Sequence, residues 1–497
     1  MATNTKAPNH IEFAGDYNND HIFLHTHYGE TIDIKNMVDE LNIYESIYKN
    51  ALTGSVVMTD AQNLISKLQI QGMERLSFKI ATPGVTRSRD AVDATEKTGH
   101  PFHIYKITNR VQTAPGTLRY VLHFGSREFM RNIRTKVSQA YDGRLDRAVY
   151  AIFLDENYLD SRKTLTFEPC GNSDKFTIGN MRPFDAINMI AKRALPEKSN
   201  GVGYYFYETT KGYHFRSWEN MCVSQGRNRR PTKQVFYYAP INIKEDADVP
   251  NKIEYDYKLI DNYEFITNVH DTAANTALGT YGHRVISYNF FDKSFTEEDY
   301  NYHNQFALTK HTDSATSQFY GEKYAVGESN VDETIANQKT QSSKVSDYPE
   351  SRVSLQPTTQ FTHNTPEGSY GIDVLEDGRK LGQEISQRNQ VLNGTTLKLT
   401  VKGQSYIEAG DVIEFKMRAV DEKNPDGQED PQFSGRYIIT KVRHKINPTR
   451  YDMILECSKD SVKTGYTRSY KKIAQNKNIA TLRDAYQVEK GESYGSL

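Results

Sequence analysis

Four segments in the last quarter of the chain carry its clearest strand pattern: TTLKLTVKG (395–403), IEAGDVIEFKM (407–417), SGRYIITKVRHKI (434–446) and RYDMILECS (450–458). Every second residue from Leu397 to Val401 and from Tyr451 to Leu455 is apolar. Side chains two residues apart in a strand lie on the same face of a sheet. The alternation therefore predicts strands with one buried face, and the glycines in these segments are typical of the turns that join such strands.

The first 125 residues show a similar pattern in shorter runs: HIFLHTHY (21–28), TGSVVMTD (53–60), RLSFKIATPG (75–84) and PFHIYKITN (101–109). Short apolar runs bounded by Gly, Pro, Asn and Asp predict the strands of a sheet or barrel. The spacing of Leu64, Ile65 and Leu68 predicts a short helix between two of these strands. We expect a long loop over 85–99, which is polar.

The pattern changes at Ser126, which suits the N-cap of a helix. Four-residue apolar spacing predicts helices in SREFMRNIRTKVSQAY (126–141), RLDRAVYAIFLDENYL (144–159) and RPFDAINMIAKRAL (182–195). Pro183 suits the first turn of the last of these helices. KTLTFEPC (163–170) predicts a strand, and GYYFYETTKGYHFRSW (203–218) predicts a hairpin that turns at Lys211-Gly212. Residues 126–235 therefore form a predicted α+β module.

Strand character resumes in QVFYYAPINI (234–243), YDYKLIDNYEFITNV (255–269) and YGHRVISYNFF (281–291). The stretch 296–370 is rich in Ser, Thr, Asn, Gln and acidic residues without a sustained period, which predicts a long polar insertion or loop system. A helix is expected over 374–391. The tail from Lys463 is basic and polar, and NIATLRDAYQVEK (478–490) predicts one short helix in it.

The composition predicts a folded chain of several domains. At 497 residues, the chain exceeds the roughly 250–300 residues at which a single core stops growing. Only 37% of its residues are hydrophobic when Tyr is counted and Gly is not. The usual apolar count includes Gly and omits Tyr, but 31 Gly replace 33 Tyr here, so the fraction stays nearly the same. Typical domains reach about 45–50% on that count. Disorder does not fit 11% aromatic residues and a net charge of −1. Tyr covers large contact areas while its hydroxyl stays hydrated, so we expect extensive interfaces with other proteins.

Several classes of protein are disfavoured by the same numbers. With 62 basic and 63 acidic residues, the chain lacks the net basic surface that nucleic acid as a primary ligand requires. MATNTKAPNHIEF has no apolar core of a signal peptide, and no run of about 18 apolar residues occurs, which predicts a soluble protein made in the cytoplasm. Cys170, Cys222 and Cys457 lie far apart, so we expect three reduced and mostly buried thiols.

Sequence motifs typical of catalytic or metal-binding sites are nearly absent. The chain contains no HExxH, P-loop or EF-hand motif, and no GxSxG that follows a predicted strand as a nucleophile elbow does. His25 and His27 would lie on one face of a strand, but a pair of His without a third ligand is more often an ordinary surface strand than a metal site. The basic run GRNRRPTK (226–233) could contact phosphate, although a solvated loop between domains is the more favoured interpretation. Acidic groups such as Glu297 and Glu298 lie in polar sequence. We therefore expect no catalytic, cofactor-binding or metal-binding residues, and no cofactor.

Three segments together carry a resemblance to the central hub protein of contractile-tail phage baseplates, the T-even-type hub. The first is ETIDIKNMVDELNIYESIYKNALTGSVVMTDAQNLISKLQIQGMERLSFKIATPG (30–84), with Tyr44, Glu45, Gly54, Asp60, Gly72 and Glu74 at matching places. The second combines RPFDAINMIAKRAL with the 203–218 segment, through Pro183, Phe184, Tyr207, Glu208, Gly212, Phe215, Arg216 and Ser217. The third covers 397–457, through Gly403, Gly410, Asp411, Gly435, Tyr437 and His444. The likeness spans most of 30–300 and 375–458.

The resemblance implies a multi-domain, mainly β, α+β protein with two tube-like β-barrels and an α+β module. The implied domains are an N-terminal arm with the first barrel (1–125), the α+β module (126–235), the second barrel (236–299 and 371–460), a polar insertion (300–370) and a polar C-terminal tail (461–497). Two similar barrels in one chain would let a homotrimer present six quasi-equivalent barrels. Such a ring would adapt a six-fold tail tube to a three-fold central spike.

The resemblance also implies partners and a location. These partners are two further copies of the chain, the central spike protein, the tail tube protein and other baseplate proteins. Phage DNA or a tape measure would pass through the channel without specific binding, and no membrane insertion is implied. The implied location is the tail baseplate of the virion, assembled in the host cytoplasm. We further expect the tail to order on a neighbouring subunit or the spike, with Ile479, Leu482 and Tyr486 lining the contact.

Three alternatives stay open. The hub of bacterial contractile injection and type VI machines shares the architecture that the resemblance implies. A tail-associated hydrolase of cell-wall polymer or polysaccharide would need a clustered acid pair on a rigid element, and none is evident in the sequence. A carbohydrate-binding adhesin is weaker, because Trp218 is the only tryptophan available to stack on sugars.

Overall fold

The protein is described from a computed structural model, which covers residues 11, 13–83, 90–98, 100–222, 231–238, 252–266, 271–289, 293, 295–306, 308–313, 346, 348–358, 364–365, 368–369, 381–389, 394–417, 429–430 and 432–463.

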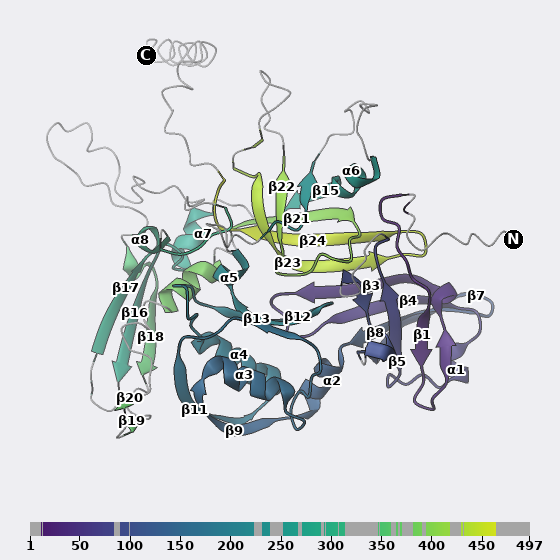
Figure 1. Ribbon diagram of the computed structural model, residues 1–497, viewed down its shortest axis with the longest axis horizontal. Coiled ribbons are helices and arrows are strands. Elements are labelled where there is room, and N and C mark those ends of the chain that lie inside the picture. The colour runs from purple at the N-terminus through teal and green to yellow at the C-terminus, as the bar shows by residue number, and fades with distance from the viewer. Residues whose placement is uncertain are drawn as a thin grey trace, which may run out of the picture. The chain divides into compact units, whose positions relative to one another are not determined.

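One large sheet of 14 strands dominates this part of the chain (Figure 1). The order along its main path is β15 (Ile260–Phe265), β21 (Thr395–Lys402), β24 (Tyr451–Lys459), β23 (Gly435–Ile446), β3 (Val38–Ser46), β4 (Thr53–Asp60), β8 (Thr117–Gly125), β7 (Phe102–Ala114), β5 (Arg75–Ile80), β1 (Ile22–His25) and β2 (Thr31–Asp33). Off this path, β22 (Val412–Lys416) pairs with β23 and with β14 (Val235–Tyr237), while β6 (Val92–Asp93) pairs with β5.

The path divides at the antiparallel pair β23–β3, whose register runs from Lys441 opposite Ser46 to Ile446 opposite Leu41. On one side lie strands from the predicted second barrel, and on the other lie strands from the first 125 residues. The predicted class, mainly β within α+β, is confirmed. Closure into two separate barrels is not observed among the described strands. Instead, the pairing of β23 with β3 joins strands of both predicted barrels in one continuous sheet.

The described part of the predicted α+β module contains two small sheets and four helices. The sheets are β9 (Val137–Arg144) with β11 (Ser173–Met181), and β10 (Leu165–Phe167) with β13 (Gly212–Ser217) and β12 (Tyr204–Thr209). The helices are α2 (Arg127–Arg134), α3 (Leu145–Leu154), α4 (Pro183–Arg193) and α5 (Trp218–Cys222). In α4, Pro183 occupies the first turn, and Phe184, Ile187 and Ile190 are buried in the core of the module, as the spacing predicted.

Two predictions in this region were wrong in detail. The helix expected over 126–141 ends at Arg134, because Val137 is buried in strand β9 opposite Met181. Pairing with a distant strand overrides the local helical spacing there. The hairpin turns one residue earlier than expected, since Thr209 pairs with Gly212 across the turn.

A third sheet joins strands from the predicted second barrel with a strand from the predicted polar insertion. It consists of β17 (Phe295–Asn301), β16 (Gly282–Asn289) and β18 (Val353–Thr358), so β16 and β17 pair with β18 instead of joining the large sheet. The short pair β19 (Asn364–Thr365) and β20 (Gly368–Ser369) completes the strands, and the remaining helices are α1 (Leu64–Lys67), α6 (Lys252–Lys258), α7 (Thr272–Ala277), α8 (Tyr302–Phe306), the 3-10 turns Lys35–Met37, Glu96–Thr98 and Pro349–Ser351, and residues 381–389. The expected strand over 255–269 begins only at Ile260. The residues before it form α6, in which Lys258 pairs with Glu254 one turn away at 2.7 Å.

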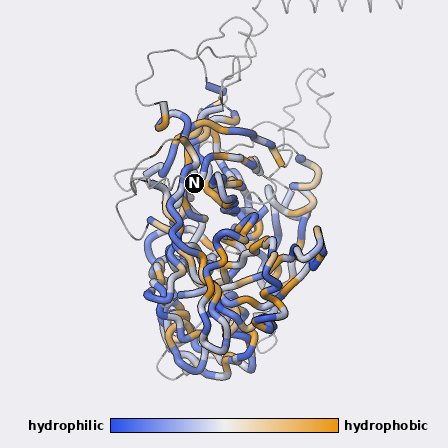
Figure 2. The backbone as a smooth tube through the Cα atoms, turned by 90° about the vertical axis from the view of Figure 1, so that its right-hand side faces the viewer, coloured by the Kyte–Doolittle hydropathy of each residue, from blue (hydrophilic) through white to orange (hydrophobic). Residues whose placement is uncertain are grey.

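The hydrophobic core follows these divisions. One cluster of buried residues runs through both sides of the large sheet, and a second fills the α+β module. Along the described backbone, hydrophilic and hydrophobic residues are interleaved, without long apolar stretches (Figure 2). No helix in the described ranges is long and apolar enough to span a bilayer. Cys170, Cys222 and Cys457 are buried free thiols, as expected.

Candidate functional site at the junction of the sheets

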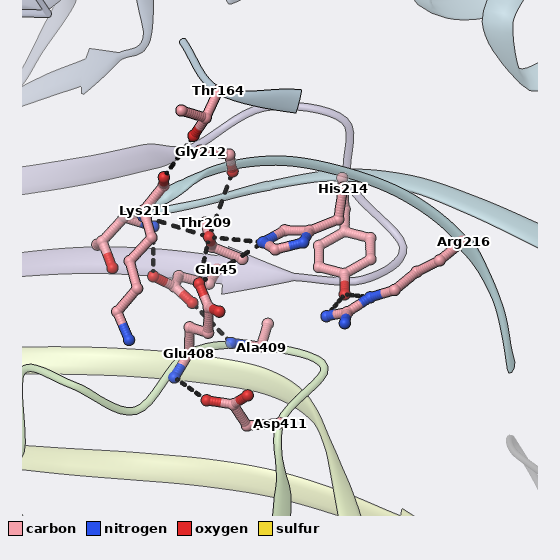
Figure 3. Close-up of polar contacts among 12 residues, drawn as sticks. Glu45, Thr164, Thr209, Lys211, Gly212, His214, Arg216, Glu408, Ala409 and Asp411 are labelled. Atoms are coloured by element: carbon pink, nitrogen blue, oxygen red, sulfur yellow. Dashed lines mark hydrogen bonds and ion pairs between the residues drawn. The ribbon is translucent and has the colours of Figure 1, made fainter. Parts of the chain in front are cut away.

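Three segments that are far apart in sequence meet in a buried polar cluster (Figure 3). They are strand β3 of the large sheet, the β12–β13 hairpin of the α+β module, and the loop 403–411 that precedes β22. We call the cluster of Glu45, Thr209, His214, Glu408 and Asp411 the junction. Each of these side chains is less than one tenth exposed, so their charges and hydrogen bonds must be satisfied inside the protein.

Glu45 links all three segments. Its Oε1 accepts a hydrogen bond from the backbone N–H of Thr210 at 2.8 Å, and its Oε2 accepts one from the backbone N–H of Ala409, also at 2.8 Å. The ring Nε2 of His444, on β23, lies 3.4 Å from Oε1. One carboxylate therefore holds the tip of the hairpin and the 403–411 loop against strand β3.

Glu408 forms the second link between the hairpin and the loop. Its Oε2 accepts a hydrogen bond from the Thr209 hydroxyl at 2.6 Å and lies 3.6 Å from His214 Nε2. Burial alone would raise the pKa of Glu408, but the hydrogen bond and charge of His214 and the charge of Lys211 outweigh it and hold the pKa well below its usual range. Glu408 is therefore ionised at neutral pH and contributes attraction across the junction.

The loop needs a glycine at its closest approach to the hairpin. Gly410 has φ +83°, and a Cβ on it would lie 2.2 Å from the Tyr207 hydroxyl and 2.8 Å from Arg216. Arg216 in turn donates to that hydroxyl through Nε at 2.8 Å. Any side chain at 410 would therefore push the loop away from the hairpin.

A second buried cluster lies at the other side of the hairpin and contains Glu128, Lys163 and Glu208. The ammonium group of Lys163 lies 2.9 Å from Glu128 and 2.5 Å from Glu208. Glu208 also accepts hydrogen bonds from the backbone N–H of Leu52 at 2.8 Å and from the Tyr213 hydroxyl at 3.0 Å. Burial and the neighbouring Glu128 raise the pKa of Glu208, although the charge of Lys163 opposes them.

This cluster borders a cavity of about 210 Å³. The cavity is lined by apolar and cationic residues that include Val92, Phe102, Arg162, Lys163 and Lys211. A buried carboxyl with a raised pKa beside a cavity is a feature of many active sites. Glu128 and Glu208 are a clustered acid pair of the kind that a hydrolase would need, and the sequence did not reveal them.

The contacts of the two acids favour a structural role. Glu128 is engaged by Lys163 and by the Ser161 hydroxyl at 2.7 Å, and Glu208 by Lys163, Leu52 and Tyr213. A general acid or base must be able to reach a substrate proton. Here the cation lies between the two carboxyl groups, and Glu208 ties the turn before β4 to the hairpin.

Asp460, directly after β24, makes a third connection. Its carboxylate accepts hydrogen bonds from His311 Nδ1 at 2.9 Å, from the backbone N–H of Thr312 at 3.0 Å and from the indole of Trp218 at 3.4 Å. It thus joins the end of the large sheet to helix α5 and to the segment after α8. Burial would raise the pKa of Asp460, but His311 and Thr312 lower it to about 2. Burial would lower the pKa of His311, but Asp460 raises it above the ordinary 6.5.

These shifts predict a pH window of stability. Because the pKa of Asp460 is depressed from 3.8 to about 2, its contribution of about 2 kcal/mol is present above pH 4 and is lost as the pH falls toward 2. Because the pKa of His311 is raised, its contribution is present below pH 6.5 and is lost as the pH rises through the folded value. Urea midpoints should therefore fall between pH 6.5 and pH 9 in the wild type and fall less in His311→Gln. His21→Gln, at an exposed His that pairs with Asp33 at 2.7 Å, should keep the wild-type profile; an equal effect of both variants would contradict the assignment.

The other candidate residues are placed as follows. Ile479, Leu482 and Tyr486, predicted to line a partner contact, lie outside the described residues. His25 is engaged by Thr31 at 2.9 Å and by Ser77 at 2.7 Å, while His27 lies beyond the end of β1. Within the described ranges, no three His, Cys, Asp or Glu side chains come together as metal ligands.

Polar residues that carry the resemblance converge at the junction and its surroundings. They are Glu45, Tyr207, Glu208, Arg216, Gly410, Asp411 and His444, from three segments of the sequence. Sequence reasoning missed Lys163, His311 and Asp460, since each lies in a polar context without a motif. Their role depends on partners that are distant in sequence, and no local signal marks them.

Known proteins similar to the chain include a phage baseplate protein. No family model matches the chain. The chain is 20% identical over 436 residues to the probable baseplate hub protein gp334 of Vibrio phage KVP40. The aligned region covers 86% of this chain and 91% of that protein.

Solved structures similar to the chain include a 43 kDa tail protein of prophage MuSo2 from Shewanella oneidensis, with 10% identity, a TM-score of 0.48, and coverage of 90% of this chain and 100% of that one. They also include the c3393 component of the type VI secretion system of E. coli, with 9% identity, a TM-score of 0.38, and coverage of 87% and 76%. The predicted resemblance is confirmed: over most of its length, the chain is similar to a phage baseplate hub protein.

Proposed function

We propose that this protein is the structural hub of a contractile phage tail baseplate. Three copies would form a ring that adapts the six-fold tail tube to the three-fold central spike, within the tail of the virion. The observation that carries the proposal is the similarity to a probable baseplate hub protein over 86% of the chain. The junction supports it, because residues that carry the resemblance seen in the sequence hold the two sides of the large sheet and the α+β module together.

The mechanical logic follows from the junction. An adaptor between two symmetries must keep its two β-rich parts at a fixed mutual position, since each meets a different neighbour. The β23–β3 pairing and the Glu45 contacts provide that rigidity at a buried site. We propose the spike, the tube and other baseplate proteins as partners. A catalytic role has no support in the contacts of Glu128 and Glu208.

The proposal predicts the mass of the purified protein. Low hydrophobic content implies polar interfaces of moderate strength, whereas obligate interfaces often bury more than about 2,000 Å². We therefore expect a concentration-dependent equilibrium between monomer and trimer in native mass spectrometry and light scattering, shifted to trimer by the spike protein. A strict monomer that degrades cell-wall polymer, with turnover lost in Glu208→Gln, would instead favour a hydrolase.

A further inference from the structure

The hairpin formed by β7 and β8 has a tip exposed on both faces. Past Ile104, the described pairs of β7 are all with β8, and every residue from Asn109 to Gly116 is exposed. We call residues 105–119 the ribbon. A two-stranded ribbon is marginally stable in water on its own. Its register shifts three times along its length, which twists it, so a partner surface would add the burial that it lacks.

The ribbon is strongly basic for a chain of balanced charge. No Asp or Glu occurs between Glu96 and Glu128, while Lys106, Arg110 and Arg119 lie on the ribbon itself. Arg119 lies 3.4 Å from Asp39, which belongs to β3. Counting Asp39, the local charge is 3 − 1 = +2. Val111, which is 57% exposed, adds an apolar contact point near the tip.

The β17–β16–β18 sheet has the opposite character on its outward face. Along all three strands, less exposed and more exposed residues alternate, and the less exposed ones include fully buried residues on β16 and β17. The inward face buries His283, Ser287 and Tyr300. The outward face instead carries apolar side chains, among them Phe295 at 56%, Val353 at 48% and Leu355 at 78% exposure. We call this outward surface the apolar face, since it exposes more apolar side chains than the water-facing side of an ordinary sheet, although Arg284, Glu297 and Asp299 also lie on it.

The charges around the apolar face are acidic. Arg284 binds Asp299 through two hydrogen bonds, at 2.7 and 3.0 Å, which neutralises both. Glu350 beside the sheet lies 3.5 Å from the same guanidinium, and Glu297 on β17 is exposed. With Lys293, which is exposed between β16 and β17, the sum over these five groups is 2 − 3 = −1. The face thus complements the ribbon in charge, and each presents apolar side chains.

We propose that the ribbon of one copy docks on the apolar face of a second copy. This inference rests on the proposed hub and names the surfaces through which its ring would form. Because the two surfaces differ, the contact is heterologous, and such contacts close into a ring when the rotation between copies allows it. Three strands at about 4.8 Å spacing and about 23 Å length give a face of about 300 Å². A standard interface takes about 800 Å² from each partner, so this contact is one of several and fits a weak trimer.

Nucleic acid is a poorer occupant of the ribbon. Three cations interleaved with Val111 and other apolar residues offer few phosphate contacts, and non-specific binding depends on the number of phosphates neutralised. The acidic apolar face offers a surface with both required properties within the same chain.

Disulfide trapping tests the contact directly. Val111→Cys with Leu355→Cys should give disulfide-linked species up to three times the chain mass on mild oxidation, and Val111→Cys mixed with Leu355→Cys should give linked pairs. The three native thiols are buried, so their background should be low. Val111→Cys with Leu308→Cys, at an exposed Leu outside the face, is the matched control. A disulfide that forms within a single chain would mean that the ribbon contacts the apolar face of its own copy, and it would overturn the proposal.

Charge reversal provides a second readout, since a disulfide requires close Cα atoms. Arg110→Glu and Glu297→Lys should each raise the dissociation constant of the trimer about tenfold, and the two changes together should restore most of the loss. Lys67→Glu, at an exposed Lys on α1, is the control and should change little. An amine cross-linker shows independently whether trimers form. If it captures trimers while disulfide linkage stays at the control level and charge reversal has no effect, the proposed contact is wrong and the proposed hub function is unaffected. Absence of any oligomer in all assays would overturn both.

Discussion

Replacing Lys163 with methionine is expected to lower the free energy of unfolding by about 3–5 kcal/mol at neutral pH. Methionine retains most of the volume of the side chain and removes the charge that lies between Glu128 and Glu208. Both carboxyl groups are about 1% exposed, so they would face each other without a compensating cation. Urea unfolding followed by the fluorescence of Trp218, the only tryptophan and fully buried in α5, measures the loss.

Two controls make this result specific. Lys175→Met removes an exposed Lys that pairs with Asp142 at 2.9 Å, and a surface pair of this kind contributes at most about 1 kcal/mol. Adding Glu208→Gln to Lys163→Met should recover part of the loss, because only one buried charge then remains. Lowering the pH should also narrow the gap to the wild type, since an unpaired buried carboxyl takes up a proton more readily. A loss in Lys163→Met no larger than in Lys175→Met would mean that the cluster does not stabilise the fold.

Local pattern was enough to predict most of the large sheet. In β21, burial alternates with the apolar residues from Leu397 to Val401, and in β24 the apolar residues Tyr451, Met453 and Leu455 are all buried. Helix α4 was predicted for the same reason, since its apolar spacing coincides with the face that packs into the module. In these elements, local periodicity and long-range packing favour the same structure.

Local pattern failed where distant pairing decides. The pair β23–β3 joins residues about 400 positions apart, and the sequence of either strand would suit a separate barrel equally well. Strand β17 was hidden because FTEEDYN buries Glu298 and Tyr300 on its inward side. This strand therefore lacks the usual alternation of buried apolar and exposed polar residues. The exposure of the apolar face is accounted for if another surface covers it and removes its side chains from water.

The candidate site shows the same division. The resemblance drew attention to Glu45, Glu208 and His444 as matching positions, but not to what they do. Their role became clear only through partners such as Ala409, whose N–H reaches Glu45 across 364 residues of sequence. Lys163 and Asp460 had no signal at all, because a buried ion pair looks like surface sequence until both partners are placed.

Replacing Glu45 with alanine is expected to lower the free energy of unfolding by about 2–4 kcal/mol, since it leaves one buried and one partly buried backbone N–H group without an acceptor, at about 1–3 kcal/mol for a fully buried group. The groups are those of Thr210 and Ala409, both 2.8 Å from the carboxylate. Glu45→Gln keeps one acceptor oxygen and should lose about half as much. Amide hydrogen exchange gives the mechanism: peptides that contain the hairpin tip and the 403–411 loop should exchange faster in both variants, together and before the rest of the large sheet.

Glu40→Ala is the matched control, because Glu40 lies on the same strand and also reaches across to β23, through Arg443 at 3.1 Å and Lys445 at 3.5 Å. Its partners are charged side chains about one third exposed, so its loss should cost at most about 1 kcal/mol and leave the exchange of the hairpin tip unchanged. If Glu45→Ala and Glu40→Ala were equally mild, the three segments would be held by apolar packing alone. If Glu45→Ala instead loosens the hairpin and the loop while β3 and β23 stay protected, the carboxylate fixes this part of the α+β module to the sheet, beside the links made by Glu208 and Asp460. The β23–β3 pairing would then hold the two β-rich parts of the adaptor together, while the position of the module would depend on buried carboxylates.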